Sequence, residues 1–409
     1  MHATTPTLLI VGHGMATQRL LQNWVASGGQ ARTALRIQVL GDEPHAAYNR
    51  IMLSSVLAGE AGLAQLPLAT DAWYAQHGIE VISGDPAIRL DRATRKVHTL
   101  SGRQLSYDRL IIGTGSRPAA LGVPGEDLPG VIGFRTLADT QALLDAARQH
   151  RRAVVIGGGF LGLEAAEGLR KQGMTVTLLH RSSHLLNRQL DAAAGALLAD
   201  DLSQRGLRIH LNTRISGLLG RSRVRAVELA DGSVISTDLV VIAAGITPNV
   251  ELGRDAGLIC EHGLCVDSRL STSDPRIHAL GECAQFGPHT WGLVEPLYRQ
   301  ADILSALLHG ETAQYREAPV ATRLKISGIN LFSCGRVEAG ADTESIIYHD
   351  REHGIYRHLL LRDQRLVGAV LYGDTRDGPW YFDQLQRGAD IAPWRAQLAF
   401  GEPFCQAAA

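Results

Sequence analysis

Glycines with the spacing of a pyrophosphate-binding loop lie in the middle of the chain. An apolar run at 154–156 precedes a G-x-G-x-x-G motif, and an Ala-rich helix is expected over about 161–169. The first glycine of such a motif makes a tight turn, the second lets backbone approach a pyrophosphate, and the third lets the helix pack on the strand. Free N–H groups at the helix N-terminus then face the phosphates. The predicted contacts of this dinucleotide site are Gly157, Gly159, Phe160, Leu161 and Gly162.

A second unit of this kind is expected at the start of the chain. Residues 7–11 and 36–40 read as strands, with a helix between them that ends near residue 27. Acids follow the second strand, where a carboxylate can accept a hydrogen bond from a ribose 2′-OH. The third motif position is Thr17, whose branched side chain should push helix and strand slightly apart. The predicted contacts here are Gly12, His13, Gly14, Met15, Asp42 and Glu43.

Apolar runs bounded by turn residues organise the rest of the chain. Helices are expected over 137–149, 191–206 and 296–308, and strands over 208–212, 223–228, 239–243 and 277–280. Alternating residues then predict strands at 323–326, 345–349, 356–362 and 366–372, and helices at 380–387 and 393–400. The expected fold class is α/β with two Rossmann-like dinucleotide-binding domains and a small α+β domain at the end.

The overall composition narrows the function. At 409 residues the chain suggests two or three domains. The formal net charge is 40 − 41 = −1, which argues against general nucleic-acid binding because that needs a basic surface. No apolar run approaches the roughly 20 residues that span a bilayer. The five cysteines include no C-x-x-C pair, so we expect no metal site, and this scattered set fits a reducing cytoplasm.

Several strings resemble one family. The two glycine motifs, together with Thr114-Gly115-Ser116-Arg117-Pro118 and Leu280-Gly281-Glu282-Cys283, are similar to the two-dinucleotide-fold pyridine nucleotide-disulfide oxidoreductases. The resemblance implies FAD in the first unit and NAD(P)H in the second, with the first interrupted by the second. It also implies that Gly281 and Glu282 lie beside the ribityl chain of the flavin. The implied domains are 1–122 with 245–320 for FAD, 123–244 for NAD(P)H, and 321–409 for a partner or dimer contact.

A narrower resemblance covers nearly the whole chain. The strings Tyr48-Asn49-Arg50, Leu53-Ser54-Ser55, Arg188-Gln189-Leu190-Asp191 and 366–374 look like the N-terminal part of assimilatory NAD(P)H nitrite reductase large subunits and nitrate reductase electron-transfer flavoproteins. Such large subunits continue into iron–sulfur and sirohaem domains, which are absent from these 409 residues. The resemblance therefore implies a separate reductase component that passes electrons to a nitrate or nitrite reductase partner.

Glu164 is the candidate catalytic residue. The resemblance implies an acid at this place near the nicotinamide side of the flavin. The alternative is a charge in the first turn of the helix, worth about 0.3–1 kcal/mol against the helix dipole. Related reductases carry a Lys after Leu-Ser that pairs with this acid, and here that place is Ser55.

The choice between the two nicotinamide nucleotides stays open at this point. An acid at the end of the second strand would select NADH, and a nearby Arg would accommodate the 2′-phosphate of NADPH. This chain has His180 and Arg181 there, and His180 could equally be a solvated loop residue. Further candidate contacts are Thr114, Gly115 and Gly245, together with Arg50 and Arg117, either of which could equally be a surface arginine.

The resemblance implies hydride entry from the nicotinamide to the flavin and electron exit to a protein acceptor. Peroxide-reducing, water-forming and disulfide-reducing relatives need a cysteine in the first loop, and 44–62 has none. A rubredoxin or ferredoxin reductase is the alternative, and an interaction protein similar to the apoptosis-inducing flavoproteins is a third reading. The aromatic residues of the C-terminal domain are either partner anchors or its core; they are Trp380, Tyr381, Phe382, Trp394 and Phe400.

Overall fold

The computed structural model describes residues 5–326 and 328–408, which divide into two compact units. Unit 1 comprises Met1–Leu53, Ala61–Pro118 and Ile246–Glu317. Unit 2 comprises Ser54–Glu60, Ala119–Gly245 and Ala318–Ala409. Among the described residues, no helix is both long and apolar enough to cross a bilayer.

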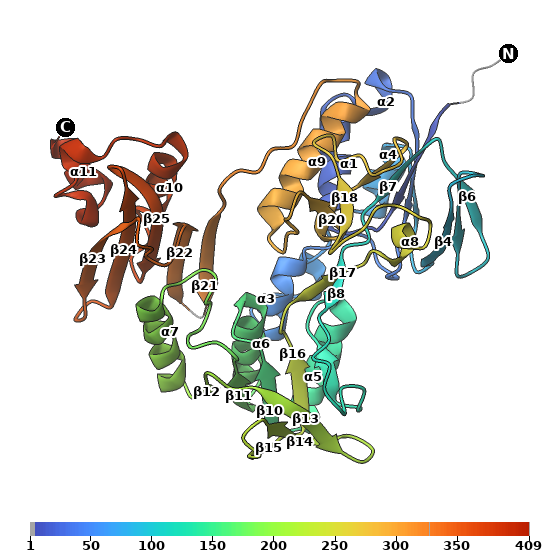
Figure 1. Cartoon of the computed structure of the whole chain (residues 1–409). Helices are drawn as coiled ribbons and strands as arrows, with labels where there is room; N and C mark the ends of the chain where they lie inside the picture. Colours follow the sequence, from blue (N-terminus) through green and yellow to red (C-terminus); the bar gives the residue numbers. More distant parts are fainter. Residues whose placement is uncertain (1–4, 327, 409) are drawn as a thin grey trace. The chain divides into compact units, whose positions relative to one another are not determined.

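Unit 1 is built on a parallel sheet with the order β19-β7-β1-β2-β3, of which Figure 1 labels β7. Its strands are β1 (Thr7–Val11), β2 (Arg36–Leu40), β3 (Ile79–Ile82), β7 (Arg109–Ile112) and β19 (Ile277–Ala279). Val11 pairs with both Leu40 and Ile112, so the carboxyl ends of these strands share one edge. Helices α1 (Met15–Ala26) and α9 (Val294–Leu308) pack against each other on this sheet through Trp24 and Leu304.

Smaller elements complete unit 1. An antiparallel sheet contains β4 (Ala87–Asp91), β5 (Lys96–Thr99) and β6 (Gln104–Ser106). Two strand pairs join β8 (Ser116–Pro118) to β17 (Ile246–Pro248) and β18 (Leu264–Val266) to β20 (Ala284–Phe286). The short helices are α2 (Gly29–Arg32), α4 (Asp71–Gln76) and α8 (Glu251–Arg254), and α3 (Leu53–Leu57) begins at the unit's boundary.

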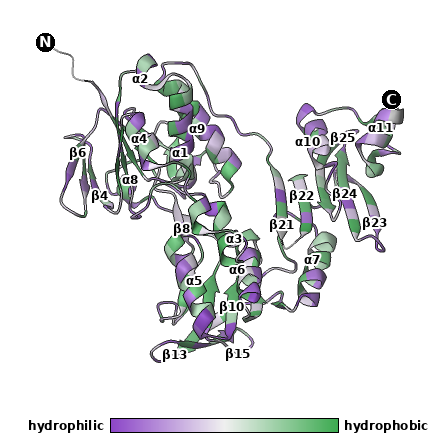
Figure 2. Ribbon diagram, turned by 180° about the vertical axis from the view of Figure 1, so that it is seen from behind, coloured by the Kyte–Doolittle hydropathy of each residue, from purple (hydrophilic) through white to green (hydrophobic). Residues whose placement is uncertain are grey.

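Unit 2 contains the second parallel sheet, with the order β12-β11-β10-β16-β9. Its strands are β9 (Val131–Gly133), β10 (Arg152–Ile156), β11 (Thr175–Leu179), β12 (Arg208–His210) and β16 (Leu239–Ile242). The helices are α5 (Leu137–Gln149), α6 (Phe160–Lys171) and α7 (Ala192–Gln204), and a small antiparallel sheet holds β13 (Ile215–Gly220), β14 (Val224–Leu229) and β15 (Val234–Ser236). Figure 2 shows β10 as a hydrophobic ribbon and α5 in mixed colours, because α5 has a buried and an exposed face.

The C-terminal part of unit 2 is an antiparallel sheet with the order β21-β22-β25-β24-β23. Its elements are β21 (Ala321–Ile326), β22 (Ile329–Gly335), β23 (Glu344–Asp350), β24 (Ile355–Arg362), β25 (Arg365–Tyr372), α10 (Gly378–Arg387) and α11 (Glu402–Ala408). The sequence did not predict β22 or α11. The helix expected over 393–400 is wrong, because that stretch forms short 3₁₀ turns at Ala392–Trp394 and Leu398–Phe400.

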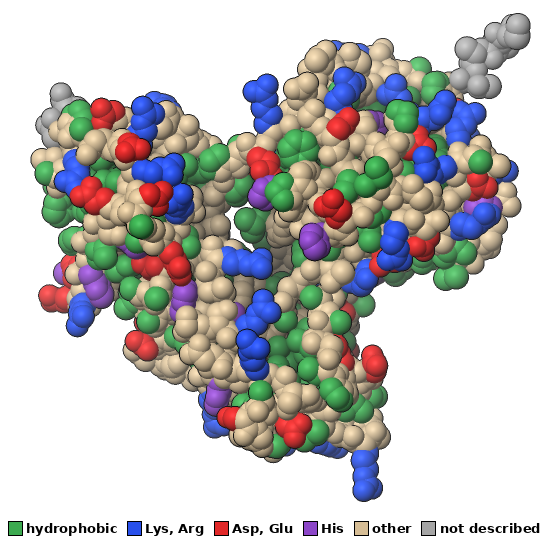
Figure 3. Space-filling view, in the orientation of Figure 1, with side chains coloured by type: hydrophobic (Ala, Val, Ile, Leu, Met, Phe, Trp, Pro, Cys, Tyr) green, Lys and Arg blue, Asp and Glu red, His purple; other side chains and the backbone are tan. Residues whose placement is uncertain are grey.

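Most of the aromatic residues singled out in this domain lie in its core. Tyr381 is fully buried, and Trp380, Phe382 and Trp394 are partly buried against the same cluster. Phe400 differs, since half of its surface is exposed. Acidic and basic side chains are interspersed over the outer face of the domain, as Figure 3 shows.

Asp191 joins helix α7 to the C-terminal sheet within unit 2. Its carboxylate caps α7 by accepting a hydrogen bond from the Ala194 N–H. The same carboxylate accepts hydrogen bonds from the Tyr356 hydroxyl at 2.5 Å and from Nδ1 of His358 at 2.6 Å. Burial opposes ionisation of Asp191, but these hydrogen bonds outweigh it and lower its pKa. The carboxylate therefore supports both the start of α7 and two buried side chains of β24.

We predict that Asp191→Ala lowers the free energy of unfolding by about 3 kcal/mol, because a cap is lost and buried donors lose their acceptor. Urea unfolding measures this, with Asp145→Ala as a control on the exposed face of α5, where we expect a change below about 0.5 kcal/mol. Because the folded pKa of Asp191 is lowered, the wild-type advantage is full at neutral pH and declines as the pH falls below about 4. Equal effects of the two substitutions would contradict this role.

Candidate functional site

Each parallel sheet has one place where the backbone of a glycine touches the loop after a neighbouring strand. Gly12 has φ +109°, and a Cβ there would lie 2.0 Å from the Gly113 carbonyl oxygen. Gly157 has φ +126°, and a Cβ there would lie 2.2 Å from the carbonyl oxygen of Ala243. Only glycine fits at either position. Gly245, at φ +128°, follows β16 two residues after Ala243, and its carbonyl accepts a hydrogen bond from the Ala119 N–H at 3.0 Å.

The helices that follow these turns begin without side-chain caps. Gly14 precedes α1 and Gly159 precedes α6, and neither helix has an acid in its first turn. By contrast, Thr136 caps α5 and Asp191 caps α7. A Cβ at Gly14 or Gly159 would meet nothing within 4 Å. Each of the two helices thus presents free N–H groups to an open space, which fits the pyrophosphate of a dinucleotide. We call this space, at the N-terminus of α1 or of α6, the cradle of its sheet. The first helical residues are partly buried: Met15, Phe160 and Leu161.

The residue at the third motif position makes different contacts in the two units. A Cβ at Gly162 would lie 1.8 Å from the Gly157 carbonyl oxygen, so the helix and the turn touch directly. In unit 1 Thr17 is buried, and its hydroxyl donates to the Gly12 carbonyl at 2.7 Å. The hydroxyl thereby replaces a bare backbone contact with a hydrogen bond, which explains why a branched residue is accommodated there.

The acids after β2 are held by their own loop. The Glu43 carboxylate accepts hydrogen bonds from the Tyr48 hydroxyl at 2.7 Å and from the guanidinium of Arg50. Arg50 also lies over the Tyr48 ring, with 4.9 Å between the guanidinium carbon and the ring centroid. Asp42 accepts a hydrogen bond from the backbone N–H of Glu43. The three predicted residues Asp42, Glu43 and Arg50 therefore lie together at the carboxyl edge of the unit 1 sheet.

His13 turns from the glycine loop toward helix α4. Its Nε2 lies 3.0 Å from the Tyr74 hydroxyl, which donates to the side-chain oxygen of Gln18 at 2.6 Å. Burial lowers the pKa of His13 to about 4, so the ring is neutral at neutral pH. His13 therefore orders the loop around the cradle without adding charge to it.

The segment after β7 is hydrogen-bonded to the segment after β17. The Thr114 hydroxyl donates to the carbonyl of Asn249, and the Asn249 side chain donates to the Thr114 carbonyl. The Gly115 carbonyl accepts a hydrogen bond from the Asn249 N–H. Arg117 is half exposed and pairs with Glu251 at 2.7 Å. Arg117 on β8 thus donates to the side chains of Asn249 and Glu251, which follow β17, and so holds these two segments together.

The return segment of unit 1 lies at the same edge. The N–H of Gly281 donates to the side chain of buried Gln300 on α9 at 2.8 Å. The Glu282 carboxylate accepts a hydrogen bond from the Ser116 hydroxyl at 2.8 Å. These contacts bring Glu282 beside the 114–118 segment, as expected of neighbouring loops at one sheet edge.

Glu164 lies in the second turn of α6, so its assignment to the first turn is wrong. The Ser54 hydroxyl donates a hydrogen bond to its carboxylate. Burial raises the pKa of Glu164 to about 7, because the single hydroxyl compensates only part of the desolvation. A carboxyl group with this pKa can exchange a proton near neutral pH.

His180 and Arg181 follow β11 but point to different surroundings. The His180 ring is buried, and its Nδ1 accepts a hydrogen bond from the Gly158 N–H at 3.0 Å. Arg181 is exposed.

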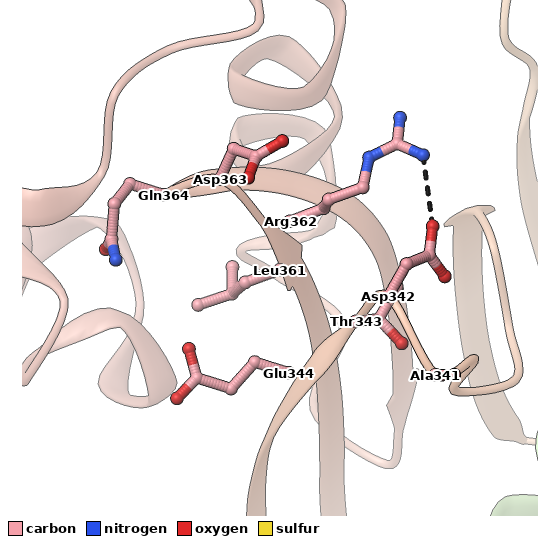
Figure 4. Close-up of a pocket in the computed structure, with 8 residues that line it drawn as sticks. All are labelled: Ala341, Asp342, Thr343, Glu344, Leu361, Arg362, Asp363 and Gln364. Carbon is pink, nitrogen blue, oxygen red and sulfur yellow. Dashed lines mark hydrogen bonds and ion pairs between the residues drawn. The ribbon is translucent and has the colours of Figure 1, made fainter.

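A separate shallow depression in the C-terminal domain is lined mostly by polar residues around the Asp342–Arg362 ion pair (Figure 4). It contains none of the predicted site residues.

The chain belongs to the pyridine nucleotide-disulphide oxidoreductase family, which residues 6–296 match. Residues 319–389 match the rubredoxin NAD+ reductase C-terminal domain. The chain is therefore an NAD(P)H-dependent oxidoreductase with FAD and NAD(P)H as its cofactors. The two uncapped helix N-termini fit these two dinucleotides.

Individual relatives share this pattern over nearly the whole chain. The assimilatory nitrate reductase electron transfer subunit of Bacillus subtilis is 40% identical over 96% of this chain and 50% of its own length. The nitrite reductase [NAD(P)H] of the same organism is 39% identical over 98% and 49%. The chain thus spans about half the length of these curated relatives. The reductase in the crystal structure of a covalent putidaredoxin reductase–putidaredoxin complex is 26% identical, with a TM-score of 0.87 over 99% of both chains.

Sequence reasoning missed residues that hold the predicted ones in place. Ser54, Gln300 and Asn249 hydrogen-bond to candidate residues; Gln300 and Asn249 are common polar residues with no motif of their own, and Ser54 was noted only as part of the string Leu53-Ser54-Ser55. The one signal in the sequence was the position of Asn249, which follows a strand that returns to the same edge of the unit 1 sheet. Within the described residues, no group of three or more His, Cys, Asp or Glu side chains could hold a metal ion.

We predict that Glu164→Gln stabilises the FAD-loaded protein at pH 8 but not at pH 5. The folded pKa of about 7 exceeds the unfolded value, so wild-type stability falls as the pH rises from about 4.5 to 7, and the neutral amide escapes this loss. Thermal unfolding at both pH values should show a gain of about 2 kcal/mol at pH 8. A difference that is the same at both pH values would contradict the raised pKa.

We predict opposite outcomes for two glycines of the same loop. Gly162→Ala should lower the free energy of unfolding by about 1–3 kcal/mol, because the methyl group collides with the Gly157 carbonyl. Gly159→Ala should change stability by less than about 1 kcal/mol but weaken nucleotide binding at least tenfold, because its methyl group enters the open cradle. Calorimetric unfolding and NADP⁺ titration measure the two effects. Full nucleotide affinity in Gly159→Ala would argue against the cradle.

Proposed function

We propose that this chain is an FAD-dependent NAD(P)H oxidoreductase that delivers electrons to the catalytic component of an assimilatory nitrate or nitrite reductase. The observation that carries the proposal is the pair of uncapped glycine-loop helices in two parallel sheets, one cradle for each dinucleotide. When bound, the flavin accepts a hydride from the nicotinamide and can release the electrons one at a time.

The assignment of each cradle rests on the residues around it. Residues 1–122 and 245–320 would hold FAD, because Asp42, Glu43 and Glu282 supply carboxylates at the unit 1 edge. Residues 123–244 would hold NAD(P)H, because the second glycine motif and Glu164 lie there. In this proposal Glu164 is the catalytic residue, and its pKa near 7 would let it hold or release a proton near neutral pH.

The choice of partner is supported by the two Bacillus subtilis relatives, which are named as a nitrate reductase electron transfer subunit and a nitrite reductase. The alternative is a rubredoxin or ferredoxin reductase. It is favoured by the match of residues 319–389 to a rubredoxin reductase domain and by the structural similarity to a reductase bound to putidaredoxin. We place the chain in the cytoplasm, which agrees with five free thiols.

Anaerobic mixing of the yellow protein with NADH or NADPH tests the oxidoreductase activity, and we expect rapid bleaching. Adding nitrate reductase, nitrite reductase, rubredoxin or a ferredoxin then identifies the acceptor by reoxidation of the flavin. Fast reoxidation by rubredoxin or ferredoxin alone would overturn the nitrogen-oxide partner. Slow bleaching with a long-lived long-wavelength absorption would favour the interaction-protein reading instead.

We propose that exposed aromatic residues of the C-terminal domain contact the partner. Phe400 is 50% exposed and Phe404 is 58% exposed, with 5.8 Å between their ring centroids. Phe400→Ser combined with Phe404→Ser should lower nitrate reductase coupling about tenfold, since aromatic anchors carry much of an interface's energy. Ferricyanide reduction should stay unchanged. Leu100→Ser, at an apolar residue of unit 1 that is 68% exposed, is the control, and equal losses in both variants would refute this contact.

A further inference from the structure

The loop after β11 holds the side chains that would meet the adenosine end of a nucleotide. In a βαβ unit, an acid at the end of the second strand binds the ribose 2′-OH of NADH, whereas an Arg nearby accommodates the 2′-phosphate of NADPH. Here β11 ends at Leu179, and the next residue, at the position of the acid, is His180.

His180 is turned inward and cannot take the place of the missing acid. Its ring is 8% exposed, and a Cβ at Gly158 would lie 2.7 Å from its Cγ. Its Nδ1 accepts the hydrogen bond from the Gly158 N–H, and burial lowers its pKa, so the ring is neutral. The imidazole therefore packs against the glycine loop, and its acceptor nitrogen, Nδ1, is occupied by the Gly158 N–H.

The two loop segments next to this position in the sheet contain arginines and no acidic residue. Residues 180–190, which run from the end of β11 toward α7, contain two arginines and no Asp or Glu. Residues 209–214, at the end of β12, contain one arginine and no acid. The first acid beyond the loop is Asp191, whose carboxylate is occupied by Tyr356 and His358.

Arg181 lies in a backbone segment that its neighbours hold in place. The Thr213 N–H donates to the carbonyl of His180 at 2.9 Å, and the Asn212 N–H donates to the carbonyl of Ser182 at 3.0 Å. The exposed Arg181 side chain starts between these two fixed residues at the carboxyl edge of the sheet. It is the basic residue nearest in sequence to the position that an acid would occupy in an NADH site.

We propose that the nucleotide site of this chain binds NADPH in preference to NADH, with Arg181 contacting the 2′-phosphate and His180 acting as a positioning residue for the glycine loop. The inference rests on the proposed function, because it concerns the same nucleotide site. Recognition of a phosphate by a guanidinium uses charge-assisted hydrogen bonds, which are about twice as strong as neutral ones.

Calorimetric titration of the FAD-loaded full chain with adenosine 2′,5′-bisphosphate and with 5′-AMP tests the preference. The two probes differ only by the 2′-phosphate, and neither can reduce the flavin. We expect the bisphosphate to bind at least about tenfold more tightly, and Arg181→Ala to remove most of that difference without changing 5′-AMP binding. Arg151→Ala is the matched control, since Arg151 is exposed at the opposite, amino end of β10.

Substitution of His180 tests its positioning role. His180→Ala should weaken both probes alike, because the Gly158 N–H loses its acceptor, and His180→Asn should restore binding, because the amide oxygen can accept the same hydrogen bond. Equal affinity of the wild type for both probes, or an unchanged ratio in Arg181→Ala, would overturn the inference. Failure of the proposed function is distinguishable, since it would appear as absence of flavin bleaching by either nucleotide.

Discussion

Close contact between two backbones at the carboxyl edge of a parallel sheet is the constraint on which the rest of the structure depends. At Gly12 and at Gly157 the chain passes so near to the next loop that a side chain has no room. That contact occurs where the connections from two neighbouring parallel strands lead to opposite faces of the sheet. Open α/β sheets bind their ligands at this place. Because the turn is fixed in this way, the following helix starts uncapped and faces open space.

The two units use the same constraint with different supports. In unit 1 the loops around the cradle are tied by side-chain hydrogen bonds, from Thr17 under the turn to Tyr48 and Arg50 on Glu43. In unit 2 the turn rests on a glycine–glycine contact and on the buried His180. The C-terminal sheet is then joined to the same unit through Asp191, a residue of one of the strings that carried the narrower resemblance.

Strand and helix positions near the glycine motifs were predictable because local periodicity and tertiary burial agree there. β1, β2 and α5 have the bounds expected from sequence. The C-terminal domain was less predictable: β22 begins three residues after the end of β21, and the stretch 393–400 forms two short 3₁₀ turns in place of one helix. Side-chain direction was the other limit, because nothing in the sequence indicates that His180 turns under Gly158 while Arg181 stays outside.

Amide hydrogen exchange of the apoprotein, the FAD-loaded protein and the FAD-loaded protein with NADP⁺ tests most directly the claim that each cradle holds one dinucleotide. We predict that FAD slows exchange at residues 13–17 in unit 1, and that NADP⁺ then slows exchange at residues 158–162 in unit 2. Protection of residues 158–162 by FAD, or protection of neither loop by NADP⁺, would contradict it.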